Sequence, residues 1–148
     1  MAGHGRHGSR IAALQALYEA DSSGHQPLEA LKRIVSRERL SQDAAAFAED
    51  LISGVLTQQD EIDRVIAQAA PAWPVEQLAA VDRNILRLAL QEMLGDNGTP
   101  VRVVINEAVE LAKSFGSASS ARFVNGVLGS VERERHKTQQ DQAITGRG

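Results

Sequence analysis

Apolar residues recur at three- and four-residue spacing along most of the chain, which is the pattern of helices that bury one face. The pattern is clearest from residue 101 to 131, where it predicts two helices. Gly116 is expected to end the first helix in a left-handed turn, which glycine tolerates. Ser119 or Ser120 is expected to cap the second helix. The serine-rich stretch 117–120 is therefore predicted to form an elbow between them.

The same periodicity predicts helices earlier in the chain. Ser9 is expected to cap a first helix, Pro27 to open a second, and Ser41 to cap a longer third. Gly54 or Thr57 is expected to kink or divide that third helix.

Other local signals refine this arrangement. Thr99 is predicted to cap the helix that starts near residue 101. Gly126 and Gly129 lie inside the last helix, where glycine costs about 1 kcal/mol against alanine, so they suggest close helix packing. Trp73, the sole tryptophan, lies between two prolines at an internal boundary. We expect it to fill the seam between two helical halves, because large aromatic side chains contribute strongly when buried.

Composition supports an all-α fold and limits the classes of function. Hydrophobic residues make up 43% of the chain and aromatics only 3%, so the core must be mainly aliphatic. The net charge of −3 argues against a general polyanion binder and requires any nucleic-acid site to be a local patch. The absence of cysteine excludes disulfides and thiolate metal sites, as in a reducing cytosol. No stretch reaches membrane-spanning length, so we expect a cytoplasmic protein with no membrane association.

The sequence offers little support for catalysis. The four histidines do not share a helical face with one another, so no zinc site is predicted. Asn106, Glu107 and Glu110 lie close together on one helix, but no nucleophile or metal-ligand set accompanies them. We interpret them as a solvated helix face, and we expect a protein without enzymatic activity or cofactor.

Binding to RNA is better supported. Arg6 and Arg10 precede the first acidic residue of the chain, and Lys113 and Arg122 flank the elbow. If the N-terminus meets the elbow, these cations form a basic surface beside Phe123. Single-stranded RNA is commonly held in this way, with cations on phosphates and an aromatic ring against a base. Phe123 has two interpretations at this point, as a core side chain or as a stacking surface.

Three stretches carry a resemblance to a known family. They are Arg10 with ALQALY at 13–18, VDRNILRLA at 81–89, and INEAVELAKSFG at 105–116 followed by RFVNGVL at 122–128. Together they resemble the NusB family of transcription antitermination factors, in order, over roughly residues 6–131. The resemblance implies an all-α fold of two packed three-helix bundles that form one compact domain.

The resemblance also implies a function. We expect a factor that, with the ribosomal protein NusE, binds the boxA element of nascent ribosomal RNA transcripts and supports read-through by RNA polymerase. The RNA-binding residues carried over from the family are Arg6, His7, Arg10, Tyr18, Lys113, Ser119, Arg122 and Phe123. The surface that faces NusE carries over to Asp82, Arg83 and Arg87.

The expected organisation has three parts. Residues 1–9 form a flexible basic arm, residues 10–135 form the NusB-like RNA-binding domain, and residues 136–148 form a disordered polar tail. The arm is poorer in arginine than is usual in the family, and the elbow lacks the usual acidic residues, so RNA affinity and base preference are expected to differ.

Two alternatives remain. A NusB-like domain also begins a family of ribosomal RNA cytosine methyltransferases, whose activity needs a downstream cofactor-binding domain and a catalytic cysteine. The other alternative is a structural helical adaptor or homodimer, which would not bind RNA at physiological salt.

Overall fold

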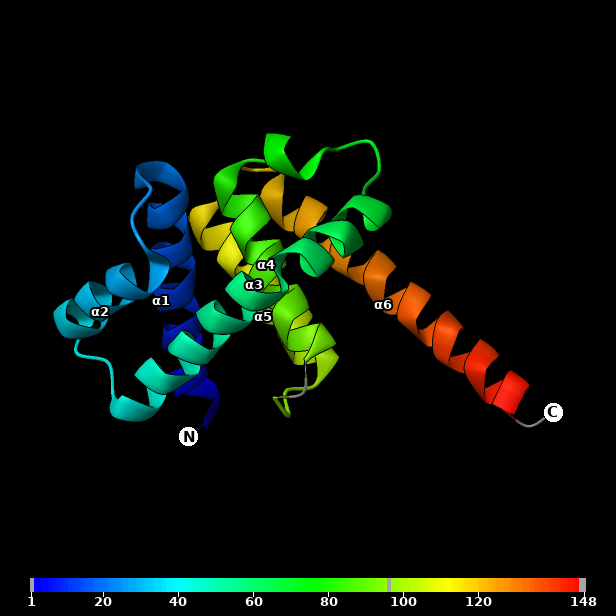
Figure 1. Ribbon diagram of the computed structural model, residues 1–148, viewed down its shortest axis with the longest axis horizontal. Coiled ribbons are helices and arrows are strands. Elements are labelled where there is room, and N and C mark those ends of the chain that lie inside the picture. The colour runs from blue at the N-terminus through cyan, green and yellow to red at the C-terminus, as the bar shows by residue number, and fades with distance from the viewer. Residues whose placement is uncertain (1, 96, 147–148) are drawn as a thin grey trace.

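The computed structural model describes residues 2–95 and 97–146, and within these ranges it contains helices and no strand (Figure 1). The elements, in chain order, are α1 (Ala2–Ser23), α2 (Pro27–Glu38), α3 (Gln42–Ala69), the short 3-10 helix η1 (Val75–Gln77), α4 (Ala80–Leu94), α5 (Val101–Phe115) and α6 (Ser120–Gly146). The predicted all-α class is confirmed.

The helices pack as two groups of three around one continuous core. α1 packs against α2 and α3, while α4 packs against α5 and α6; contacts of α4 with α1 and α3 join the two groups. The core is aliphatic, as the composition predicts, because aromatic residues are so few. The largest apolar side chains that are fully buried are Ile52, Ile62, Ile66, Ile85, Leu86, Leu90, Leu128, Val55, Val104 and Val124.

Two of the predicted helix starts are confirmed and two are wrong. Ser41 caps α3, since its hydroxyl accepts the Ala44 N–H at 3.1 Å, and Pro27 opens α2. α1 begins at Ala2, so Ser9 lies inside the helix and donates its hydroxyl to the Ala44 carbonyl at 2.7 Å. Thr99 also caps nothing, because Pro100 precedes α5 and no side chain accepts from the first turn.

The glycines act differently from the sequence-based interpretation. Gly116 ends α5 with a φ of −95°, so the expected left-handed turn is wrong. A Cβ at Gly116 would instead collide with the Ser120 side chain, and glycine therefore lets the elbow fold tightly. A Cβ at Gly126 would meet nothing within 4 Å, and one at Gly129 would meet only Arg133. Neither glycine allows a close helix contact, so that expectation is also wrong.

The expected irregularity in α3 is present, one residue beyond the expected position. The helix is kinked at Gln58, where φ is −107° and ψ is 15°. Gly54 has a different role, because a Cβ there would collide with the side chain of Gln91 on α4. The absence of a side chain at Gly54 thus allows the Gln91 side chain to pack directly on the backbone of α3.

Trp73 does not fill the seam between the helical halves, and that prediction is wrong. Its side chain is 60% exposed, in the loop that joins α3 to η1. The smaller neighbours Ala70 and Val75 are buried in the core cluster instead. Trp73 is thus left on the surface.

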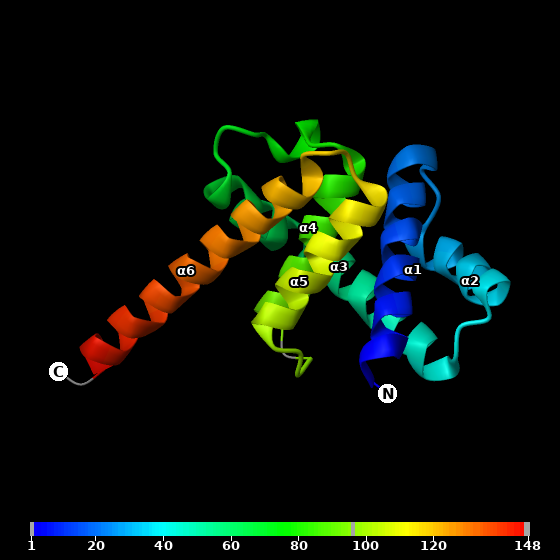
Figure 2. The same ribbon diagram turned by 180° about the vertical axis from the view of Figure 1, so that it is seen from behind.

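Both termini are more helical than expected. α1 extends back to Ala2, and α6 continues to Gly146, past the body of the protein (Figures 1 and 2). Residues such as Lys, Gln, Glu and Arg favour helix even without a buried face, and His136 pairs with Glu132 one turn earlier at 2.7 Å. Residues 1, 147 and 148 of the expected arm and tail lie outside the described residues. None of the described helices is long and apolar enough to cross a membrane.

Candidate nucleic-acid interface

The basic residues near the N-terminus lie on the first turns of α1 and contact neighbouring elements. Arg6 donates through Nη1 to the Thr99 hydroxyl at 3.1 Å, and its guanidinium carbon lies 4.8 Å from the centre of the Phe47 ring. His7 Nδ1 lies 2.8 Å from a carboxylate oxygen of Glu107 on α5. These contacts fix both side chains beside α5, with Arg6 half-buried and His7 exposed.

Arg10 does not belong to this exposed group. It is only 4% exposed, and its Nε and Nη2 donate to the two carboxylate oxygens of Glu92 on α4 at 2.8 and 2.7 Å. Asn97 donates to the same carboxylate at 3.0 Å. A guanidinium held in a buried bidentate pair is not available to a phosphate. Arg10 thus has a structural role in this fold, and its RNA contact stays a prediction.

The N-terminus and the elbow do not meet, although the basic surface considered from the sequence required them to. Arg6 contacts Thr99 just before α5, whereas the elbow follows the other end of α5. α1 and α5 lie side by side in both views (Figures 1 and 2). The candidate residues therefore form an extended band along α1 and α5 that ends at the elbow.

The far end of this band carries Tyr18 and Lys113. Tyr18, toward the C-terminal end of α1, is 45% exposed. The Lys113 ammonium pairs with Glu110 at 3.3 Å, and both side chains are mostly exposed. Exposed pairs of this kind contribute little to stability, so Lys113 is free to exchange partners. Glu107 and Glu110 are thus occupied by His7 and Lys113, in agreement with a solvated face.

The elbow is a fixed structure built from its serines. The Ser117 N–H donates to the Ser120 hydroxyl at 2.9 Å, and the hydroxyls of Ser117 and Ser119 lie 3.3 Å apart. Ser120 is buried, whereas Ser119 is exposed. The elbow therefore presents Ser119 to solvent and sets the position of the first turn of α6.

Arg122 and Phe123 lie on that first turn. Arg122 is exposed, and it makes no hydrogen bond or ion pair with any other residue that the structure describes. Phe123 is half-buried and packs against the edge of the core. Both interpretations of Phe123 thus apply in part, because one portion of the ring stabilises the fold and the rest faces solvent.

The three residues expected to face a protein partner have different surroundings. Arg87 is buried and donates through Nε and Nη2 to Asp63 on α3, both at 2.9 Å. Arg83 donates to the carbonyls of Val75, Glu76 and Leu78, of which the shortest bond, to Leu78, is 3.0 Å. Both arginines are committed to internal contacts.

Arg83 also reaches Asp21 on α1, at 3.0 Å, and Asn84 donates to the same carboxylate at 2.9 Å. Burial raises the pKa of Asp21, but the hydrogen bonds from Asn84 and Arg83 outweigh it and leave the pKa below its usual value. The contribution of this carboxylate to stability is present above its unfolded pKa and is lost as pH falls through the folded one. The cluster joins α1 to the start of α4.

Asp82 differs from its two neighbours. One carboxylate oxygen, Oδ1, is buried without a hydrogen-bond partner among the described residues, although the residue as a whole is half-buried. A buried acceptor without a donor is costly. Of the three expected partner-facing residues, Asp82 alone has a buried side-chain polar atom without a hydrogen-bond partner in the described structure.

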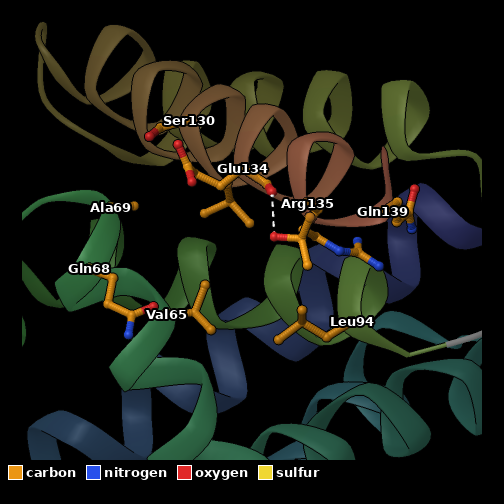
Figure 3. Close-up of a pocket in the computed structure, with 10 residues that line it drawn as sticks. Val65, Gln68, Ala69, Leu94, Ser130, Glu134, Arg135 and Gln139 are labelled. Carbon is orange, nitrogen blue, oxygen red and sulfur yellow. Dashed lines mark hydrogen bonds between the residues drawn. The ribbon is translucent and has the colours of Figure 1, made fainter. Parts of the chain in front are cut away.

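A hollow that the sequence did not indicate lies between α3, the end of α4 and α6 (Figure 3). Its volume is about 630 Å³. Arg135 links α6 to α4, because its guanidinium donates to the Met93 carbonyl at 2.6 Å. The described residues contain no group of three or more side chains that could hold a metal ion. The lining residues are Val65, Gln68, Ala69, Leu94, Ser130, Val131, Glu134, Arg135, Thr138 and Gln139.

Comparison with known structures supports the fold. A solved structure of T. maritima NusB is 33% identical, and the match covers 87% of this chain and 91% of that chain, with a TM-score of 0.81. A crystal structure of antitermination factors NusB and NusE in complex with dsRNA is 29% identical, with a TM-score of 0.81 over 88% of this chain and 98% of that one.

Comparison of sequences extends this result. The family model described as the NusB family matches residues 7–133. A transcription antitermination protein NusB from Dehalococcoides mccartyi (strain ATCC BAA-2266 / KCTC 15142 / 195) is 49% identical over 128 residues, which cover 86% of this chain and 90% of the relative. The protein of the same name from Chloroflexus aggregans is 50% identical over 85% of each chain. The chain therefore belongs to the NusB family of transcription antitermination proteins.

Proposed function

We propose that this protein binds boxA RNA of nascent ribosomal RNA transcripts together with NusE, and that the complex supports read-through by RNA polymerase in the cytoplasm. The observation that carries the proposal is Arg122, an exposed cation without a partner among the described residues, beside a partly exposed aromatic ring. A cation for phosphate next to a ring for a base is the combination that single-stranded RNA requires.

The band along α1 and α5 gives this RNA a path. Arg6 and His7 supply positive or hydrogen-bonding groups at one end, and Arg122 with Ser119 supplies them at the elbow. Arg6 would exchange its bond to the neutral Thr99 hydroxyl for one to a phosphate, which is the stronger acceptor. Tyr18 lies toward the elbow end, where its exposed ring is available to a base.

The NusE contact is proposed for the start of α4. The solved relative that holds NusE and dsRNA supports such an assembly. Asp82 is the residue of this chain that we assign to the contact, because it is half-buried in the first turn of α4 and, unlike Arg83 and Arg87, is in no ion pair among the described residues. Arg83 and Arg87 support it from within the fold.

The alternatives have less support. The similar proteins that match over 85% and 90% of their own length are named as antitermination proteins, which favours binding over methyl transfer. A structural adaptor or homodimer would leave RNA unbound at physiological salt.

A transcription assay tests the proposal. Purified RNA polymerase would transcribe a template that places boxA upstream of a terminator, with NusE and the general elongation factors present. We expect this protein to increase the full-length product, and a template with permuted boxA bases to abolish the increase. An equal product from both templates would contradict the proposal.

Replacing Arg6 and Arg122 together by alanine is expected to reduce the salt dependence of RNA binding. Each phosphate contact on single-stranded RNA contributes about 0.7 to the slope of log affinity against log salt, so losing two should lower the slope by about 1.4. Fluorescence anisotropy of labelled RNA at several salt concentrations measures it. The control is a double alanine variant of Arg37 and Arg64, exposed arginines on α2 and α3; the same slope change in both variants would contradict the assignment.

Replacing Asp82 by lysine is expected to weaken NusE binding about tenfold or more, because it reverses the charge of the side chain that we assign to the contact. Binding of labelled NusE measures the change, and circular dichroism checks that melting is little altered. The control is Asp60→Lys, which makes the same charge change on the exposed face of α3. A loss of binding that merely follows a loss of folded protein would assign Asp82 a structural role instead.

A further inference from the structure

We propose that Trp73 and Phe123 form a stacking site for one nucleobase, which extends the RNA path beyond the elbow to the loop before η1. This inference rests on the proposed function and adds a residue from a different part of the chain. Neither the sequence pattern nor the resemblance indicated Trp73 as an RNA contact, and its size predicted burial instead.

The first observation is the position of Trp73. The residue is 60% exposed, so much of its surface is accessible to a ligand. It lines a surface hollow of about 350 Å³ together with Phe123 and Arg122 from the first turn of α6. The hollow adjoins the elbow, because Arg122 and Phe123 lie on the first turn of α6, directly after residues 117–120.

The second observation is that the loop is held in place. The Trp73 N–H donates to the Ala70 carbonyl at 3.0 Å, and Pro71 and Pro74 restrict the backbone on either side. Arg83 fixes the next segment through its bonds to the carbonyls of η1. A surface that is ordered beforehand loses less entropy when it binds a ligand.

The third observation is that one wall of the hollow lacks a side chain. Gly126 lines it one turn after Arg122, and a Cβ at that position would meet nothing within 4 Å. Glycine inside a helix is unfavourable by about 1 kcal/mol against alanine, and no packing contact explains it here. The missing side chain leaves open space beside Phe123.

The chemistry of the hollow fits a nucleotide. Aromatic rings stack on any base, and an arginine beside them binds the phosphate that accompanies it. Arg122 has no acidic partner among the described residues, so its charge is available. An exposed tryptophan could also anchor a protein, but a small hollow with an unpaired cation on its rim favours a base with its phosphate.

The sole tryptophan of the chain gives a direct test. A single-stranded RNA that carries boxA and several flanking nucleotides is titrated into the full-length protein, with and without NusE. Anisotropy of the labelled RNA reports binding, and indole emission reports stacking. The same titration with Trp73→Phe, which lacks the only indole of this chain, measures the emission that comes from NusE. We expect emission to be quenched with the same midpoint as anisotropy. RNA binding without quenching would overturn the inference and leave the proposed function intact.

Two variants make the test independent of fluorescence. Trp73→Ala is expected to weaken RNA binding by about 5- to 150-fold, the loss equivalent to one stacked base, while the affinity of Trp73→Phe stays close to that of the original protein. Gly126→Leu is expected to weaken RNA binding by blocking the hollow without loss of helix stability. The control is Leu56→Ala, which removes a similarly exposed apolar side chain from α3.

The outcomes separate the possible failures. If Trp73→Ala and Gly126→Leu weaken NusE binding but leave RNA affinity unchanged, the hollow belongs to a protein contact and the inference is overturned. If the unaltered protein binds no boxA RNA even with NusE, the proposed function fails and this inference fails with it. Normal melting of the variants, together with selective loss of RNA affinity, supports the stacking site.

Discussion

Replacing Arg10 by alanine is expected to destabilise the fold by about 3–5 kcal/mol, because it leaves the Glu92 carboxylate buried without its charged partner. The two side chains are 5% and 2% exposed, so water cannot replace the lost guanidinium. The pair also joins the first helix to the fourth, at a point where Asn97 of the following loop donates to the same carboxylate. Urea unfolding followed by circular dichroism measures the change.

Two further variants separate charge from packing. Arg10→Lys keeps the charge but cannot form the bidentate pair, so we expect an intermediate loss. The double variant Arg10→Met with Glu92→Leu removes both charges and fills the space, and it is expected to be more stable than the alanine variant. If Arg10→Ala melts normally but loses RNA affinity, Arg10 is an RNA contact and its structural assignment is wrong.

Replacing Arg87 by alanine is expected to destabilise the fold by about 2–3 kcal/mol. This is less than the roughly 3–5 kcal/mol that is typical when a fully buried pair is broken. The side chains of Arg87 and Asp63 are 10% and 27% exposed, so water partly compensates Asp63. The pair ties α4 to α3 through two bonds of 2.9 Å. The same urea titration measures the loss, with Arg64→Ala, which removes an exposed arginine from α3, as the comparison.

A measurement of NusE binding distinguishes two roles for Arg87. If the arginine acts within the fold, Arg87→Ala should lose stability while the folded fraction still binds NusE. Retained stability with lost NusE binding would instead restore the role that the family resemblance implies.

Local sequence pattern predicted the helices well, because burial of one helical face is a local property. The apolar periodicity, Pro27 and Ser41 indicated elements that the structure contains. The resemblance, carried by long motifs, predicted the grouping of these helices, which periodicity alone does not determine.

The candidate site was harder to predict, because it depends on which residues meet across the fold. Arg10 lies in a basic stretch, and its partner Glu92 is 82 positions away. Arg83 and Arg87 likewise form pairs with distant acids on α1 and α3. No local signal distinguishes these arginines from Arg122, which remains exposed.

Trp73 shows the opposite error. Its size predicted burial, but the two flanking prolines direct the backbone through a loop, and the smaller Ala70 and Val75 occupy the core. The prolines were visible in the sequence, and they indicated a loop position more reliably than side-chain size indicated burial.

The central claim is sequence-selective RNA binding with NusE, and a single titration tests it most directly. Labelled boxA RNA and the same RNA with its boxA bases permuted are titrated with an equimolar mixture of this protein and NusE, at a fixed physiological salt concentration. We predict that boxA RNA binds at least about tenfold more tightly than the permuted RNA, the loss expected from one or two mismatched base contacts. Equal affinity for the two RNAs, or no binding of either, would contradict it.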